Sequence, residues 1–255
     1  MGGSVGGRPA RARFEELAWQ RTPLGELSLR RRWDPVAGCD VYEIKLAGEF
    51  LMSSLFTTGE MELARLALAR LAEHGLSGAP LEVAVGGLGL GYTAQAVLDH
   101  PDVGSLVVVE ALREVIDWHR RRLVPAAAVL DADQRCRMLH GDFFAMLRSP
   151  AGLDPANPGR RFHAVLVDID HSPRHLLHRD HAWLYQPAGL RRLAARLHPG
   201  GVFALWSNDP PDDQFRATLR EVFGQVSAET VRFPNPYQPR EGAANTVYLA
   251  TNTPG

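Results

Sequence analysis

The sequence contains little cysteine, a single lysine (Lys45) and no long uncharged apolar run. Cys39 and Cys136 stand in no C-x-x-C pair, which excludes a disulfide framework and a cysteine-based zinc site. Residues 1–14 lack the apolar core of a signal peptide, and no later segment is long and apolar enough to span a membrane, so we expect a cytoplasmic protein without membrane contact. A formal net charge of -1 over 255 residues argues against electrostatic binding of nucleic acid.

The apolar residues that are present suffice for a packed core, because 45% of the chain is hydrophobic. Residues 1–13 are expected to be a disordered tail. Residues 14–58 are predicted to form a small antiparallel β unit, because strand-like alternation with a two-residue period occurs in three segments, 25–32, 40–48 and 49–54. A helical apolar pattern that ends near Gly75 then opens a larger domain over residues 59–255.

From Leu81 onward, strand and helix patterns alternate along the chain. This alternation predicts right-handed βαβ units and a mostly parallel sheet with helices on both faces, which is a Rossmann-like α/β fold. One of the predicted helices is rich in histidine and follows Asp170. The last two strand patterns, QVSAETVRF and NTVYLATN, have no helix between them and predict an antiparallel hairpin at the C-terminal edge of the sheet.

Four glycines separate a strand pattern from a helix pattern in LEVAVGGLGLGYTAQA: Gly86, Gly87, Gly89 and Gly91. Glycine allows positive φ angles and lets the backbone approach a ligand closely, which is typical of a nucleotide-binding turn. The residues from Gly89 to Ala94 also satisfy the dinucleotide pattern G-x-G-x-x-A, so NAD is an alternative ligand.

Acidic residues follow the next three predicted strands. Glu110 comes about 20 residues after the glycines, where a carboxylate can accept hydrogen bonds from a ribose. Asp142 follows the third strand, and Asp168 and Asp170 follow the fourth. Any one of these acids could instead cap the helix after it, but together they favour a binding site at the carboxyl edge of the sheet.

The segments VAVGGLGLG, VVVEALREVIDWHRRRL, LHGDFFAML and AVLVDIDHSP, in this order and spacing, resemble the spermidine synthase (polyamine aminopropyltransferase) family within the class I S-adenosylmethionine-dependent methyltransferase superfamily. The resemblance covers most of the chain after about residue 40. It implies that the glycine loop, Asp142 and Phe143 bind the nucleoside of a sulfonium donor and that Glu110 holds its ribose. It also implies that Asp168 orients or deprotonates an acceptor amine, with Asp170 at the acceptor's cationic end.

The chain departs from the family at Gly89, where the family has an aspartate. Without this acid the loop does not repel the carboxylate of intact S-adenosylmethionine. Our first prediction is therefore transfer of a methyl or other alkyl group from S-adenosylmethionine to a small amine or other heteroatom nucleophile. One alternative is aminopropyl transfer from decarboxylated S-adenosylmethionine, and another is a non-catalytic nucleoside-binding sensor or scaffold.

The acceptor site also differs from the family. The family's glutamine falls near Leu51 or Met52 and its tyrosine at Leu63, which points away from putrescine as the acceptor. Tyr237 loosely matches another family tyrosine and is predicted to contact the acceptor. By resemblance, the N-terminal β unit covers the site or mediates homodimerisation.

The histidine-rich segment offers a further candidate. His171, His175 and His178 are spaced to share one helical face, which can bind zinc. A solvated helix with one histidine near the acceptor is the favoured interpretation, so we predict no metal and take His171 as a candidate general base. The arginine runs 30–32 and 120–122 are interpreted as solvated faces.

Overall fold

The structure is a computed structural model that describes residues 14–76, 80–238 and 240–253. The tail predicted over residues 1–13 lies outside this part of the chain. The chain divides into two compact units, Met1–Leu55 and Phe56–Gly255. The sequence-based boundaries, 14–58 and 59–255, stay a proposal for the domain organisation.

The first unit is an antiparallel sheet in the order β1-β2-β3-β4, as the sequence predicts. Its strands are β1 (Phe14–Thr22), β2 (Gly25–Asp34), β3 (Cys39–Leu46) and β4 (Glu49–Ser53). Strand β1 was not anticipated, because a register shift between Glu16 and Ala18 interrupts the two-residue alternation on which strand prediction depends.

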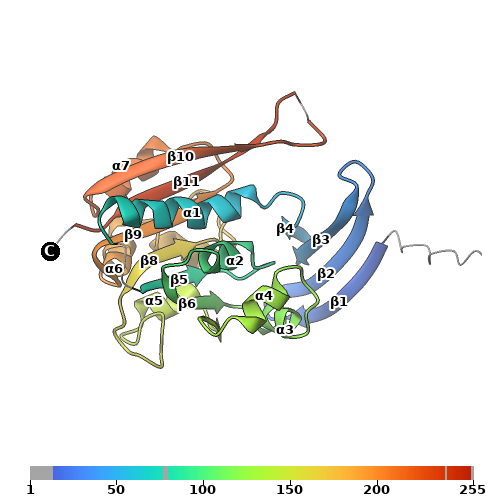
Figure 1. Cartoon of the computed structure of the whole chain (residues 1–255), viewed down its shortest axis with the longest axis horizontal. Helices are drawn as coiled ribbons and strands as arrows, with labels where there is room; N and C mark the ends of the chain where they lie inside the picture. The colour runs from blue at the N-terminus through green and yellow to red at the C-terminus, as the bar shows by residue number, and fades with distance from the viewer. Residues whose placement is uncertain (1–13, 77–79, 239, 254–255) are drawn as a thin grey trace, which may run out of the picture. The chain divides into compact units, whose positions relative to one another are not determined.

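The second unit contains a seven-stranded sheet in the order β10-β11-β9-β8-β5-β6-β7 (Figure 1). Its strands are β5 (Leu81–Gly86), β6 (Val103–Glu110), β7 (Cys136–His140), β8 (Phe162–Val167), β9 (Leu197–Ser207), β10 (Gln225–Phe233) and β11 (Ala243–Thr251). Strands β5 to β9 pair in parallel, and β10 and β11 form the predicted antiparallel hairpin. The strand order reverses between β5 and β8, which is the point where open α/β sheets bind their ligands.

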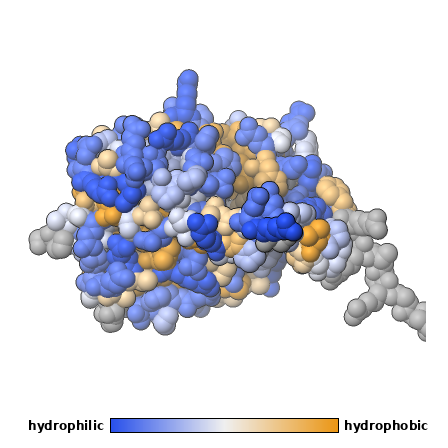
Figure 2. Space-filling model, turned by 90° about the horizontal axis from the view of Figure 1, so that it is seen from above, coloured by the Kyte–Doolittle hydropathy of each residue, from blue (hydrophilic) through white to orange (hydrophobic). Residues whose placement is uncertain are grey.

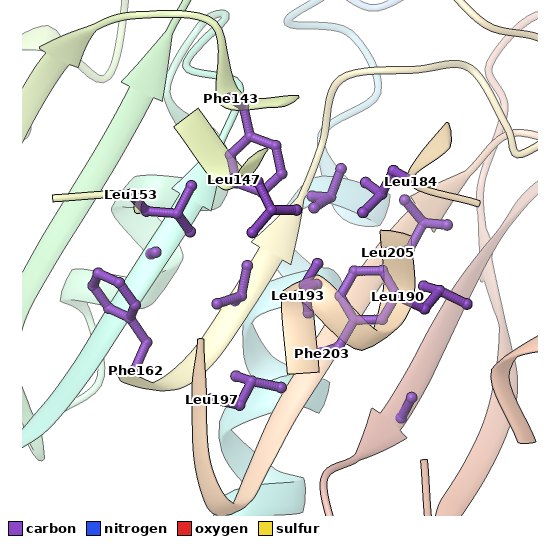
Figure 3. Packing of buried hydrophobic residues seen from close by; sticks show 14 of the residues in the cluster. Phe143, Leu147, Leu153, Phe162, Leu184, Leu190, Leu193, Leu197, Phe203 and Leu205 are labelled. Atoms are coloured by element: carbon purple, nitrogen blue, oxygen red, sulfur yellow. The ribbon is translucent and has the colours of Figure 1, made fainter. Parts of the chain in front are cut away.

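Helices cover both faces of this sheet (Figure 1). They are α1 (Thr58–Glu73), α2 (Tyr92–Leu98), α3 (Arg113–Arg120), α4 (Ala127–Ala132), α5 (Phe143–Arg148), α6 (Pro187–Ala194) and α7 (Asp213–Arg220). Helices α1 and α2 pack together on one face, and α6 lies between α5 and α7 on the other. On this second face, Leu190 and Leu193 of α6 lie beside Phe203 of β9 within a large apolar cluster (Figure 3).

The histidine-rich helix predicted after Asp170 is absent. Residues 171–178 form bends, followed by a short 3-10 helix, η1 (Arg179–Trp183). The side chains of Ser172 and Asp170 accept hydrogen bonds from the backbone N–H groups of this segment, including those of His175 and Leu177. These local side-chain bonds replace the helical backbone bonds, so the prediction of a helix was wrong.

The surface face shown in Figure 2 is mostly hydrophilic, with hydrophobic residues scattered across it. Among the described residues, no helix is both long enough and apolar enough to cross a membrane.

Candidate functional site

The glycine loop joins β5 to α2 at the switch point of the sheet. Gly87, Gly89 and Gly91 have φ angles of 93°, 47° and 93°, a region that side-chain-bearing residues rarely adopt. A Cβ atom on Gly87 would lie 2.1 Å from the carbonyl oxygen of Asp168, at the end of the neighbouring strand β8. The loop therefore has no room for a side chain there, and its backbone runs directly beside Asp168.

Two buried side chains hold the loop in place. Glu110, at the end of β6, accepts hydrogen bonds from the backbone N–H groups of Leu88 (3.0 Å) and Leu112 (2.8 Å), one on each carboxylate oxygen. A ring nitrogen of His119 in α3 donates to the carbonyl oxygen of Gly89 (2.9 Å). Burial raises the pKa of Glu110, against the effect of these backbone N–H bonds, and burial lowers the pKa of His119. Both oxygens of Glu110 keep lone pairs that could accept ribose hydroxyls.

Asp142 and Phe143 lie where β7 meets α5. Asp142 caps α5, because its Oδ1 atom accepts from the N–H groups of Phe144 (2.8 Å) and Ala145 (3.1 Å). The Phe143 side chain is buried against Gly86, where a Cβ would lie 2.7 Å from the ring. Asp142 thus has the helix-capping role that the sequence left open, and its second carboxylate oxygen takes no part in the capping bonds. The Phe143 side chain belongs to the core.

Asp168 lies beside a second acid that the sequence analysis did not single out. Thr93 of α2 donates a hydrogen bond of 2.6 Å to Oδ2 of Asp168, and the same hydroxyl lies 3.3 Å from the backbone carbonyl oxygen of Glu60 in α1. Burial raises the pKa of Asp168 to about 6, against the effect of the Thr93 bond. Burial, and then repulsion from Asp168, raise the pKa of Glu60 to about 8. The negative charge of Asp168 thus opposes ionisation of Glu60.

Asp170 is buried and its two oxygens are both engaged. Oδ1 accepts from the N–H of Leu177 (2.7 Å) and from Nδ1 of His181 (2.8 Å), and Oδ2 accepts from the hydroxyl of Tyr185 (2.7 Å). His181 also stacks on Phe144, with ring centroids 3.8 Å apart. In this structure Asp170 holds the segment after β8 in place, so its contact with an acceptor stays a prediction from resemblance.

This arrangement of Asp170 makes a stability prediction. Asp170→Ala leaves the Tyr185 hydroxyl and the Leu177 N–H without their acceptor, and we expect a loss on the order of 3 kcal/mol in the free energy of unfolding. Urea denaturation measures this loss, with Asp180→Ala on the exposed η1 helix as the control. An Asp170→Ala protein as stable as the control would contradict the structural role.

The histidines of the segment after Asp170 do not share one face. His175 lies 3.0 Å from Asp209, and Nδ1 of His178 caps η1, whereas His181 binds Asp170. His171 follows Asp170, and its backbone carbonyl accepts from Asn208 at the end of β9 (2.7 Å). The structure therefore gives no shared zinc site for these residues, and a role of His171 as a base stays a prediction.

Tyr237 lies half-exposed in the loop between β10 and β11. At the base of this loop, Phe233 contacts Phe56, which lies two residues before the first residue of α1, with ring centroids 5.8 Å apart. The loop is thus anchored next to the start of the helix that carries Glu60. Contact of Tyr237 with an acceptor stays a prediction.

Within the described ranges, one group of side chains has the spacing of a metal site: Glu82, His163 and His198 have ligand atoms within 4.8 Å of one another. They lie near the amino ends of β5, β8 and β9, at the opposite edge of the sheet from the glycine loop. Arg160 binds Oε1 of Glu82 (2.6 Å), and Nδ1 of His163 accepts from the Glu82 N–H (3.0 Å). These bonds occupy Oε1 of Glu82 and Nδ1 of His163, while Oε2 of Glu82 lies 3.6 Å from Nε2 of His198.

Close packing of polar side chains against Gly59, at the start of α1, was also missed from the sequence. A Cβ atom on Gly59 would lie 2.4 Å from Oδ1 of Asn245 in β11 and 2.6 Å from Nε1 of Trp206 in β9. The Trp206 Nε1 atom is buried without a hydrogen-bond partner among the described residues. The one feature of the sequence that could have indicated polar contacts at the start of α1 was Glu60, an acid on the same buried helical face as Leu63 and Ala64.

Solved structures of spermidine synthases and of a methyltransferase-like protein share this fold. A spermidine synthase in complex with the transition-state analogue AdoDATO superposes with a TM-score of 0.69 at 16% identity, covering 94% of this chain and 74% of that one. The Thermotoga maritima spermidine synthase gives a TM-score of 0.67 at 16% identity, covering 94% and 73%. Human methyltransferase-like protein 13 in complex with SAH gives 0.51 at 20% identity, covering 77% and 80%. The fold is therefore that of class I S-adenosylmethionine-dependent methyltransferases.

Sequence similarity points to one group of proteins among those that share this fold. Polyamine aminopropyltransferase 2 of Pseudomonas aeruginosa is 30% identical over 166 residues, which are 61% of this chain and 43% of that protein. The match thus spans less than half the length of that relative, and no family model matches the chain. By sequence and by fold, the chain is similar to spermidine synthases and polyamine aminopropyltransferases, as the resemblance in the sequence indicated.

Proposed function

We propose that this protein transfers the aminopropyl group of decarboxylated S-adenosylmethionine to a small aliphatic amine. This was the alternative in the sequence analysis, and the similarity to a polyamine aminopropyltransferase favours it over methyl transfer. The observation that carries the proposal is the acidic pair of Asp168 and Glu60 beside the glycine loop. Acids at this position suit a nucleophile that arrives as an ammonium ion.

The residues at the sheet edge that carries the glycine loop fit a sulfonium nucleoside. The glycine loop has positive φ angles that side-chain-bearing residues rarely adopt, the oxygens of Glu110 can accept from ribose hydroxyls, and by resemblance Asp142 would accept from the adenine amino group. The donor supplies an activated carbon next to a positive sulfur, so the protein mainly aligns the reactants and excludes water. Both the family resemblance and the geometry of these residues support these roles.

In the proposed reaction, Asp168 first takes a proton from the ammonium group of the acceptor, because its raised pKa makes it a stronger base than an ordinary aspartate. The freed nitrogen lone pair then attacks the aminopropyl carbon attached to sulfur. The carbon–sulfur bond breaks, and the sulfur keeps the electron pair and leaves as neutral 5′-methylthioadenosine. The product nitrogen keeps both of its protons as a secondary ammonium ion, which carries the positive charge that the sulfur has lost.

Calorimetric titration with the two sulfonium donors tests the proposal. We expect decarboxylated S-adenosylmethionine to bind more tightly than S-adenosylmethionine. Tighter binding of the carboxylated donor would instead support the second candidate, methyl transfer, which the absence of an acid at Gly89 favours.

Gly89 provides a direct prediction about donor choice. Gly89→Asp places a negative charge in the loop and is expected to weaken binding of intact S-adenosylmethionine by about 10- to 100-fold relative to the decarboxylated donor. Aspartate tolerates a positive φ better than most residues, so the loop at φ 47° can accept it. Binding of 5′-methylthioadenosine, which has no charged side chain, is the control and should change little. An equal loss for both donors would show that the residue does not face the donor's charged end.

A further inference from the structure

His119 of α3 lies fully buried behind the glycine loop. A Cβ atom on Gly91 would lie 2.7 Å from Cε1 of its ring, 2.8 Å from Cδ1 of Leu130 and 3.0 Å from Cβ of Ala126. The ring therefore packs against the loop beside two apolar side chains. Apolar surroundings of this kind suit a leucine better than a histidine, so the imidazole calls for a further reason.

The hydrogen bonds of His119 use only one of its two ring nitrogens. Nε2 lies 2.9 Å from the carbonyl oxygen of Gly89, and because a carbonyl only accepts, Nε2 carries the ring proton and Nδ1 has a bare lone pair. Nδ1 is buried and has no hydrogen-bond partner among the described residues. A buried polar atom without a partner destabilises a fold, so the bond from Nε2 to Gly89 is the contact that accounts for a histidine here.

Gly89 is held on both sides of its Cα atom. On one side, the Glu110 carboxylate accepts from the N–H of Leu88 (3.0 Å) and also from the N–H of Gly89 itself. On the other side, His119 binds the Gly89 carbonyl. Glycine has the greatest backbone freedom of all residues, so the peptide group after Gly89 can turn to other orientations once the His119 bond is lost.

We propose that His119 is a positioning residue for the sulfonium donor, which fixes Gly89 at its φ of 47° before the donor arrives and does so at a cost in stability. His119 lies behind the loop and acts on the donor through Gly89. A loop that is already ordered loses less conformational entropy when its ligand binds, and the ligand therefore binds more tightly. The part of this inference that concerns the donor rests on the proposed function, whereas the ordering of the loop does not.

Three variants separate the bond to Gly89 from the packing of the ring. His119→Leu fills the same space but removes the bond, and His119→Gln keeps an N–H donor at the distance of Nε2 along the side chain. Asp117→Asn, in an exposed ion pair with Arg120 on the same helix, is the control. We expect the urea midpoint of His119→Leu to be at or above that of the wild type, because the unpaired Nδ1 is gone. A lower midpoint would overturn the cost in stability and indicate a purely structural histidine.

Amide hydrogen exchange, followed by NMR without ligand, reports on the order of the loop. The N–H groups of Leu88 and Gly89, which bond Glu110, should exchange at least about fivefold faster in His119→Leu than in the wild type. In His119→Gln they should exchange within about twofold of the wild type, and the amides of β5 should not change in either variant. Equal protection of the loop in His119→Leu and the wild type would overturn its ordering by His119.

Calorimetry with 5′-methylthioadenosine tests the effect on the ligand. His119→Leu should bind it about 5- to 30-fold more weakly, which corresponds to the entropy of ordering the backbone of one residue. His119→Gln and Asp117→Asn should stay within about threefold of the wild type. Unchanged affinity of His119→Leu would overturn the positioning role, and absence of binding by the wild type would overturn both this role and the proposed function.

Steady-state kinetics distinguish a positioning residue from a catalytic one. In His119→Leu, the KM for decarboxylated S-adenosylmethionine should rise by the same factor as the nucleoside dissociation constant, while kcat stays within about twofold of the wild type. A fall in kcat without a change in KM would contradict the proposal. If the wild type binds the nucleoside but forms no aminopropylated product, the proposed function is refuted, and the exchange and binding results still decide the role of His119.

Discussion

Replacing Asp168 by asparagine is expected to lower kcat/KM for aminopropyl transfer by about 10²- to 10⁴-fold, the usual contribution of a positioned general base. Asparagine has nearly the shape of aspartate and can still accept the 2.6 Å hydrogen bond from Thr93. The local structure should therefore persist, while the proton acceptor is lost. Because burial raises the pKa of Asp168 to about 6, kcat/KM of the wild type should increase as the pH rises through this value.

The comparison between turnover and binding decides the role of Asp168. Calorimetry with 5′-methylthioadenosine should show binding within about twofold of the wild type, because Asp168 acts on the acceptor and not on the nucleoside. Asp131→Asn, in an exposed ion pair with Arg122, is the control for turnover. Full activity of Asp168→Asn would refute its assignment as the base. Loss of both turnover and nucleoside binding would instead indicate a structural role.

Gly87→Ala is expected to be the most damaging small substitution in the sheet. Its Cβ would lie 2.1 Å from the carbonyl oxygen of Asp168, and the N–H of Asp168 is bonded to the carbonyl of Gly86 in the same strand pair (2.9 Å). The clash is with backbone, so β5 and β8 must separate to relieve it. We expect a loss of more than about 3 kcal/mol in the free energy of unfolding, or failure to fold.

Gly159→Ala separates the clash from the cost of the backbone angle. Gly159 also has a positive φ, 80°, but a Cβ there meets no atom within 4 Å. Its substitution should cost only about 1 kcal/mol. Thermal and urea unfolding of both variants test the difference, and equal losses would show that the contact between Gly87 and Asp168 does not matter.

The elements that could be predicted from the sequence are those with local signals. Three features can each be recognised from a few neighbouring residues: the glycines of the loop, the acids at the ends of β6, β7 and β8, and the absence of a helix between β10 and β11. Because the carboxyl ends of parallel strands lie at one edge, the sequence alone is enough to expect Asp168 near Gly87. The structure agrees with this placement.

The parts that could not be predicted depend on contacts between distant segments. Glu60 meets Asp168 only because α1 packs against α2 and β8, and no motif links these residues. The segment after Asp170 has helical histidine spacing, yet it folds around the Asp170 carboxylate through Leu177, His181 and Tyr185. Periodicity cannot reveal a buried acid that collects hydrogen bonds from the segment that follows it.

The most direct test of the proposed aminopropyl transfer is the identity of the product. Mass spectrometry after incubation of the protein with an aliphatic diamine and both sulfonium donors distinguishes the two reactions in one mixture. The proposal predicts an amine extended by an aminopropyl group, together with 5′-methylthioadenosine. A methylated amine with S-adenosylhomocysteine, and no aminopropylated product, would contradict it.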